Sequence, residues 1–450
     1  MIFNIKNSII YARQTGVYKM AIGDIIVSLD IGASKTAAVV GQVNKFGEIE
    51  VVGYGLEKSS GIKKGRIINS TAVAESLVKA ITEAEDTSGL YINSAYVNIK
   101  GLNTRIERIR FKGEVEKPDD GLSFRDITSV IEKIQLGIRQ NSKEQIVDII
   151  PTKYIVNDRE YVEEPIGAFA KYFLIDADVI IADKSVIEEI TKAMDLAELK
   201  IDGFVLETFA TSNVVLMPEE KDLGVLLLDV GAAHTEISVY KNGALEYNNT
   251  LPVGGDHITS DIAISLNIDL DEADKLKRQY NLAIEAMISN NHDIKLNTKK
   301  TVDDDSNVVK CSDVVRIIEA RIKEIYQITR KIMAENNLIG KIECAVITGQ
   351  GISNISGVEE LAVLTLKINQ VRICSPKLIN IIKPQHIVAF GMVKYIANIG
   401  TSKRVNSDVE IMTEPGVKDK IFGVINKAKD KLMNTLKRKN DEDEELKGDF

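Results

Sequence analysis

The 450-residue sequence has no tryptophan, three cysteines and few aromatic residues, and each of these shortages excludes a class of protein. With aromatics at 5% of the chain, we do not expect a platform that stacks nucleic-acid bases. The cysteines, Cys311, Cys344 and Cys374, have no paired spacing, which is typical of a reducing cytoplasm and of a chain without a cysteine-bound metal. The net charge of -9 argues against nucleic acid as a main partner.

Long apolar runs are also missing. No stretch approaches the roughly 20 apolar residues of a membrane-spanning helix. Residues 1–20 do not resemble a signal peptide, because Asn4, Lys6 and Asn7 interrupt their apolar runs and no small-residue cleavage site follows. A translation start at Met20 agrees with the sequence as well as a functional arm does. The hydrophobic fraction of 44% and the length are enough for several subdomains with large cores.

Two similar stretches about two hundred residues apart are the strongest signal. The first, at 27–41, reads VSLDIGASKTAAVVG: an apolar strand ending in Asp30, a small-residue turn and a second apolar strand, which predicts a β-hairpin. The second, at 225–240, reads VLLLDVGAAHTEISVY and repeats this plan with Asp229. Small residues let a phosphate approach the backbone N–H groups of such a turn, and the aspartates could hold a metal ion through water. We therefore expect two related halves that hold one polyphosphate.

A third element, at 345–351, reads AVITGQG, a buried strand that runs into a Thr-Gly-x-Gly turn. In this order the three motifs resemble the actin-type ATPase superfamily, which includes actin, sugar kinases and DnaK-type chaperones. Further motifs resemble the FtsA family of bacterial cell-division proteins: VNIKG at 97–101, PIGAFAKYFLIDADVIIAD at 165–183 and LPVGGDHITSDIAISLNIDLDEADKLK at 251–277. The resemblance covers residues 24–439.

The resemblance implies an α/β, actin-like two-domain fold with ribonuclease-H-like halves, an inserted strand-helix-strand-strand subdomain and a C-terminal amphipathic helix. The alternative for the insert is a continuation of the first sheet. The expected segments are an N-terminal extension (1–23), the first domain (24–101 and 184–223), the insert (102–183), the second domain with its phosphate hairpin (224–258), its helical subdomain (259–341), the adenosine motif and return to the first domain (342–399), a linker (400–417), a membrane-targeting helix (418–439) and an acidic tail (440–450). Within them we expect, among others, helices at 124–140, 256–290 and 313–336 and a polar loop at 291–310.

The resemblance also implies ATP and Mg²⁺ as cofactors. The implied nucleotide-binding residues are Asp30, Gly32, Ala33, Ser34 and Lys35 in the first phosphate motif, Asp229, Gly231, Ala232, Ala233 and His234 in the second, and Thr348, Gly349, Gln350 and Gly351 in the adenosine motif. Asp274 and Lys277, about one helical turn apart, match an acid–base pair near ribose and adenine, although alone they read as a solvated surface pair. His234 is equally consistent with a residue that only supports the fold.

Four residues bear on hydrolysis. Glu207 follows the strand 204–206, where many superfamily ATPases place a residue that orients the attacking water. The alternative is a helix N-terminal glutamate favoured by the helix dipole. Ala232, Ala233 and Gln350 stand where the family usually has glycine. Each added Cβ crowds backbone near phosphate and disfavours a positive φ. We therefore expect a slow ATPase at most.

The segment 418–439 predicts an amphipathic helix with eight basic and two acidic residues, a net charge of +6. Such a helix lies in a membrane interface and is attracted by anionic lipid. The alternative is a helix docked on the protein's own core. The implied membrane-binding residues are Ile421, Phe422, Ile425, Leu432, Met433 and Leu436 on the apolar face, with Lys427, Lys431 and Arg438 on the basic face.

Taken together, the resemblance implies an ATP-binding, filament-forming protein that tethers the tubulin-like FtsZ to the membrane and helps to assemble the division ring. The expected partners are the FtsZ C-terminal peptide near 259–340, further copies of the chain through the insert, an anionic membrane surface and other divisome proteins. The expected location is the cytoplasmic face of the membrane, peripherally bound at the division septum. The alternatives are a pilus-assembly-type adaptor, or an actin-fold kinase or reactivating factor.

Overall fold

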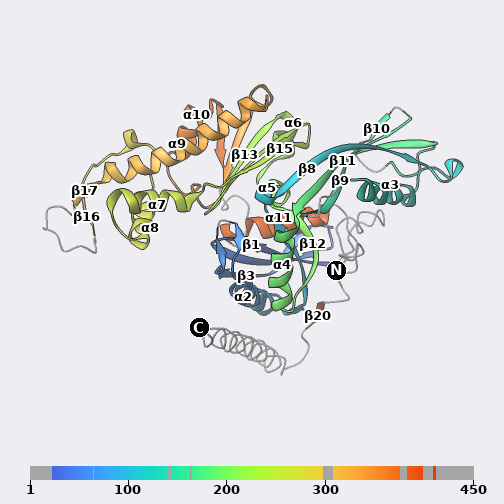
Figure 1. Ribbon diagram of the computed structural model, residues 1–450, viewed down its shortest axis with the longest axis horizontal. Coiled ribbons are helices and arrows are strands. Elements are labelled where there is room, and N and C mark those ends of the chain that lie inside the picture. Colours follow the sequence, from blue (N-terminus) through green and yellow to red (C-terminus); the bar gives the residue numbers. More distant parts are fainter. Residues whose placement is uncertain are drawn as a thin grey trace, which may run out of the picture.

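The computed structural model describes residues 23–398, apart from 64, 139–142, 158, 162–164, 297–307 and 375–382, together with 409–411. The strands of its first half are β1 (Ile25–Ile31), β2 (Lys35–Val43), β3 (Ile49–Lys58), β7 (Ser94–Ile99) and β12 (Lys200–Leu206). They form one sheet in the order β12-β7-β1-β2-β3. Figure 1 labels β12, β1 and β3 of this sheet. The first three strands are an antiparallel meander, and β7 and β12 run parallel to β1.

The second half repeats this arrangement. Its strands are β13 (Val225–Val230), β14 (Thr235–Lys241), β15 (Ala244–Leu251), β18 (Cys344–Thr348) and β19 (Gln370–Ile373). Their order is β15-β14-β13-β18-β19, again an antiparallel meander followed by two parallel strands. The tip of each hairpin closes in the same way: the Gly32 N–H donates to the Lys35 carbonyl at 2.9 Å, and the Gly231 N–H donates to the His234 carbonyl at 2.9 Å. The prediction of two related halves is confirmed.

Helices cover both faces of the first sheet. They are α2 (Ser70–Ser88), α4 (Lys184–Leu196), α5 (Glu207–Val215) and α11 (Ile387–Asn398). Side chains alternate along β1, so Val27 and Leu29 pack towards α2 and α4, whereas Ile26 packs towards α11. The backbones of α5 and α11 are in close contact where the two helices cross, since a Cβ on Gly391 would lie 2.1 Å from the Ala210 carbonyl oxygen. α5 leads through α6 (Pro218–Leu223) into β13, so this crossing lies where the chain passes between the halves.

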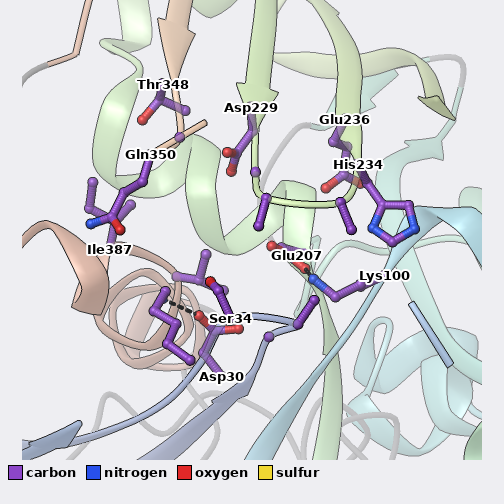
Figure 2. A pocket seen from close by; sticks show the side chains of 18 of the residues that line it. Asp30, Ser34, Lys100, Glu207, Asp229, His234, Glu236, Thr348, Gln350 and Ile387 are labelled. Atoms are coloured by element: carbon purple, nitrogen blue, oxygen red, sulfur yellow. Dashed lines mark hydrogen bonds and ion pairs between the residues drawn. The ribbon is translucent and has the colours of Figure 1, made fainter. Parts of the chain in front are cut away.

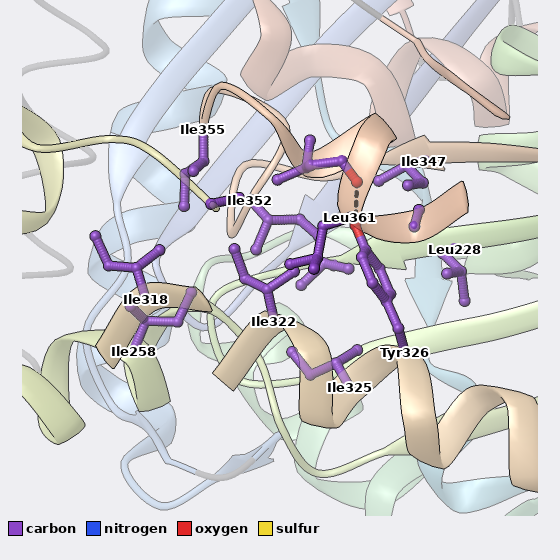
Figure 3. Close-up of a cluster of buried hydrophobic side chains, with 14 of the residues drawn as sticks. Leu228, Ile258, Ile318, Ile322, Ile325, Tyr326, Ile347, Ile352, Ile355 and Leu361 are labelled. Atoms are coloured by element: carbon purple, nitrogen blue, oxygen red, sulfur yellow. Dashed lines mark hydrogen bonds between the residues drawn. The ribbon is translucent and has the colours of Figure 1, made fainter. Parts of the chain in front are cut away.

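The second half has its own core, centred on one long helix. Its helices are α7 (Gly255–Leu266), α8 (Leu270–Gln279), α9 (Cys311–Glu335) and α10 (Val358–Leu366). Figure 3 shows α9 presenting Ile318, Ile322 and Tyr326 to Ile352 and Leu361. The Tyr326 hydroxyl donates to the Val358 carbonyl at 3.2 Å, which satisfies the polar end of this buried ring.

Two predictions for the second half are wrong in detail. The helix expected at 256–290 is broken, because Asn267 adopts the left-handed conformation and Asp269 starts α8 by accepting the Glu272 N–H at 2.8 Å. The polar loop expected at 291–310 contains a two-stranded antiparallel pair, β16 (Asp293–Lys295) and β17 (Val308–Lys310).

The insert forms a separate sheet in the order β10-β9-β11-β8. One face is covered by α3, whose Val130, Ile131 and Ile134 share a core with Phe173. The strand-helix-strand-strand subdomain is therefore confirmed, with β10 added and with a helix that ends before residue 140; continuation of the first sheet is wrong. Its elements are β8 (Thr104–Glu114), α3 (Phe124–Gly137), β9 (Glu144–Val156), β10 (Arg159–Tyr161) and β11 (Tyr172–Asp183).

Short elements complete the fold: β4 (Ile62–Lys63), β5 (Arg66–Ile67), β6 (Leu90–Ile92) and β20 (Val409–Ile411), with 3-10 turns at Gly101–Asn103, Pro118–Asp120, Glu285–Met287, Ile339–Lys341 and Pro384–His386. β20 lies in the predicted linker and pairs antiparallel with β6. The predicted amphipathic helix at 418–439 and the acidic tail lie outside the described residues. Within the described residues, no helix is both long and apolar enough to cross a bilayer.

Candidate functional site

The strand order brings polar side chains to one edge of each sheet. β12, β7 and β1 are parallel neighbours, so their carboxyl ends meet, and these ends carry Glu207, Asn98 and Asp30. In the second half, Asp229 on β13 and Thr348 on β18 are direct Cα partners. The two edges face one cleft, whose empty space is about 970 Å³ when the open solvent at its mouth is included (Figure 2).

Most of the predicted site residues line this cleft. They are Asp30, Gly32, Ala33, Ser34, Lys35, Glu207, Asp229, Gly231, Ala232, Ala233, His234, Thr348, Gly349 and Gln350. Gly351 lies beneath the second hairpin, where its N–H donates to the Val230 carbonyl at 2.8 Å.

Asp274 and Lys277 are not among the cleft-lining residues. Lys277 reaches the start of α7, where its Nζ donates to the Gly255 carbonyl at 3.1 Å and to Thr259 Oγ1 at 2.7 Å. Asp274 accepts from Arg278 Nε at 2.7 Å on the same helix. Lys277 therefore supports α7 beside the second hairpin, because the Gly255 N–H itself donates to the Gly231 carbonyl at 2.9 Å.

Asp30 is fixed from two sides. Lys35 Nζ donates to Asp30 Oδ2 at 2.7 Å, and Asn98 Nδ2 donates to Asp30 Oδ1 at 2.9 Å. Asn98 is itself oriented, because its Oδ1 accepts the Ile31 N–H at 2.7 Å. Lys35 also donates to the Gln385 carbonyl. Sequence reasoning did not assign Asn98 a role, although the motif VNIKG contains it.

Asp229 is held in the second half by Thr211, whose Oγ1 donates to Asp229 Oδ2 at 3.2 Å. Burial, and then the neighbouring charge of Glu207, raise the pKa of Asp229 to about 6. The first glycine of the third motif, Gly349, leaves room for the Asp229 carboxylate. Gly349 has φ +88°, and a Cβ at this position would lie 2.4 Å from Asp229 Oδ1.

Sequence reasoning also missed Lys100 and Glu236. Glu236 is the direct partner of Asp229 across the second hairpin, is 8% exposed and lines the cleft. Burial first, and then the charges of Glu207 and Asp229, raise the pKa of Glu236 to about 8. Lys100 Nζ donates to Glu207 Oε2 at 3.0 Å. A signal for Glu236 was available, since a hairpin centred on the Gly231 turn sets it opposite Asp229.

The expected strain at the non-glycine positions is absent. Ala232, Ala233 and Gln350 are not among the described residues with positive φ, so their Cβ atoms cost no unfavourable backbone conformation. Slow hydrolysis stays a prediction, because the backbone angles do not test it. The His234 ring packs against the turn between β4 and β5, where a Cβ on Gly65 would lie 2.6 Å from its Cε1.

Two family models match the chain. Residues 226–391 match a model described as "Cell division protein FtsA", and residues 103–181 match one described as "SHS2 domain inserted in FTSA". A "Cell division protein FtsA" from Neisseria meningitidis serogroup B is 30% identical over 336 residues, which are 74% of this chain and 80% of that protein.

Solved structures share the fold. A chain of the "PilM-PilN type IV pilus biogenesis complex" matches with a TM-score of 0.58 and 18% identity, over 84% of this chain and 99% of that chain. MreB5 of Spiroplasma citri, solved bound to ADP, matches with a TM-score of 0.51 and 11% identity, over 84% and 97% of the two chains. At these identities the likeness shows the actin-like fold alone.

Proposed function

The chain belongs to the FtsA family of bacterial cell-division proteins, and from this premise we propose that it is an ATP-binding, filament-forming protein that tethers FtsZ to the cytoplasmic membrane. It would act as a peripheral protein at the division septum and help to assemble the division ring with other divisome proteins. Membership in this family sets aside the pilus adaptor, kinase and reactivating-factor alternatives.

Nucleotide binding is supported by one observation above all: two equivalent hairpin turns face each other across a single cleft. Each turn offers backbone N–H groups between small residues, a pattern suited to phosphate oxygens. The third motif lines the same cleft through Thr348, Gly349 and Gln350, so we assign the adenosine to its side.

The acidic residues fit Mg²⁺. Carboxylate oxygens are ligands that this hard cation prefers, and Asp30 and Asp229 approach the cleft from opposite halves. We assign both aspartates to the metal through water, where the cation would neutralise phosphate charge. Glu207 is our candidate for orienting a water, with hydrolysis slow at most.

The test is thermal unfolding with and without ATP and Mg²⁺. A ligand at 100 times its Kd stabilises the folded state by about 2.7 kcal/mol, so Tm should rise in the wild type. Asp229→Ala should remove this rise, because it deletes a carboxylate inside the cleft. Asp195→Ala, which removes an exposed carboxylate from α4 outside the cleft, is the matched control and should keep the rise. Equal rises in wild type and Asp229→Ala, or none in wild type, would contradict ATP–Mg binding.

Our assignment of the surfaces that bind partners is based on membership in the FtsA family. We place the contact between copies on the insert at 102–183, and the FtsZ C-terminal peptide in the helical subdomain at 259–341, beside α9. We assign membrane binding to the segment 418–439. Fluorescence polarisation with a labelled FtsZ C-terminal peptide tests the second assignment, and no binding at high micromolar protein would count against it.

A further inference from the structure

The cleft has two chemically different ends. Figure 2 shows Gln350 and Ile387 at one end, and Lys100, His234 and Glu236 at the other, with the second hairpin turn between them. The first of these ends carries the third motif. A nucleotide whose adenosine lies there and whose phosphates follow the turns directs its terminal phosphate towards Lys100.

The position of Lys100 follows from strand register. β7 and β12 are parallel, and Ile99 is the Cα partner of Leu206. The next residues, Lys100 and Glu207, therefore emerge side by side, and their Nζ and Oε2 atoms lie 3.0 Å apart. The backbone after Lys100 is pressed against the second half, since a Cβ on Gly101 would lie 2.8 Å from Glu236 Oε1. Lys100 is thus held at the junction of the two halves.

The ammonium group of Lys100 has more hydrogen-bond donors than acceptors around it among the described residues. It carries three N–H donors, and Glu207 is its one hydrogen-bond acceptor among the described residues. The side chain is 24% exposed and lines the cleft. Burial would lower the pKa of Lys100, but the neighbouring carboxylates of Glu207 and Asp30 outweigh it and raise the pKa, so the group stays charged. A fixed cation with free donors is suited to an anionic oxygen.

The other charged residues of the cleft make the positive charge of Lys100 important for binding a phosphate. The carboxylate of Glu207 would repel a phosphate at this end of the cleft. Of the described residues that line the cleft, only Lys35 and Lys100 carry a permanent positive charge. Lys35 is already bonded to Asp30 and to the Gln385 carbonyl.

We propose that Lys100 donates hydrogen bonds to the terminal phosphate of the bound nucleotide and thereby makes the cleft prefer a nucleoside triphosphate to a diphosphate. Glu207 holds the ammonium group in place when the phosphate is absent. This inference rests on the proposed function, because it needs a nucleotide in the cleft.

The test measures the Kd of Mg–ATP and of Mg–ADP by titration calorimetry. Lys100→Gln should weaken ATP roughly 10- to 100-fold, the effect of losing a hydrogen bond to a charged group, and leave ADP within about threefold. Lys100→Arg keeps the charge and should retain the preference for ATP. Lys79→Gln is the matched control, because it removes a lysine that pairs with Glu57 on the surface of the same half.

A second variant separates phosphate binding from a structural role. Lys100→Gln leaves Glu207 without its cation, whereas the double variant Lys100→Gln/Glu207→Gln removes both charges and should show the same ATP-selective loss. Equal weakening of ATP and ADP, or an unchanged ratio of their Kd values, overturns this inference alone. Failure of the folded wild type to bind either nucleotide overturns the proposed function as well.

Discussion

Replacing Glu236 by glutamine should stabilise the protein at alkaline pH. The side chain is 8% exposed and lies near Glu207 and Asp229. Burial, followed by the charges of these neighbours, raises its pKa from an ordinary 4.5 to about 8. At neutral pH the carboxyl is therefore protonated in the folded state and ionised in the unfolded state.

The sign of the effect follows from the two pKa values. Between about pH 4.5 and pH 8 the folded state binds one more proton than the unfolded state, so the free energy of unfolding falls as pH rises through this window. The free-energy cost of ionising the buried Glu236 carboxyl is therefore absent below this pH window and fully present above it. A tenfold change in proton concentration corresponds to about 1.4 kcal/mol, so the loss between pH 6 and pH 8.5 is at most about 3 kcal/mol. Glutamine has nearly the same shape and does not ionise.

The assay is urea unfolding followed by circular dichroism at pH 6 and pH 8.5, without nucleotide or metal. The stability of Glu236→Gln relative to wild type should rise by up to about 3 kcal/mol between these pH values. Glu188→Gln, which removes an exposed carboxylate from α4, controls for the loss of a glutamate outside the cleft. The reasoning is refuted if the relative stability of Glu236→Gln is equal at both pH values, or if Glu188→Gln gives the same trend.

Three further predictions concern other parts of the chain. Gly391→Ala should destabilise the protein by about 1–3 kcal/mol in thermal unfolding, because its Cβ would meet the Ala210 carbonyl. Gly340→Ala is the control, since nothing lies within 4 Å of its Cβ. Equal effects of the two variants would count against the close crossing of α5 and α11. Truncation before Lys418 should abolish flotation with anionic vesicles, and flotation of the full chain should weaken with salt, since charges are screened over about 8 Å; a truncated protein that still floats would show another anchor. Removal of 102–183 from a chain that stays folded should abolish filaments in negative-stain microscopy, and persisting filaments would disprove the role of the insert.

Local patterns predicted the parts of the site that depend on local structure. An apolar run, a small-residue turn and a second apolar run specify a hairpin within about fifteen residues, and both hairpins formed as expected. The break in the helix at 256–290 was also local: Asn267 followed by Asp269 and, three residues later, Glu272 is a stop followed by a new start. The prediction of one continuous helix did not take these signals into account.

Residues that meet through tertiary structure could not be found in this way. Lys100 meets Glu207 only because β7 and β12 are neighbours in register, and 107 positions separate the two residues. Asn98 reaches Asp30 across 68 positions for the same reason. No periodicity in the sequence encodes which strands become neighbours. The family resemblance fixed the strand plan, but it carried over only the positions that match its motifs.

The short strand β20 limits how the protein can be oriented on a membrane. Pairing with β6 attaches residues 409–411 to the first half, on the side away from the insert in Figure 1. Only residues 412–417 then separate β20 from the proposed membrane helix at 418–439, and six extended residues span at most about 22 Å. If the segment 418–439 binds lipid as we propose, this reach keeps the β6 edge near the lipid surface and leaves the insert on the far side of the first half.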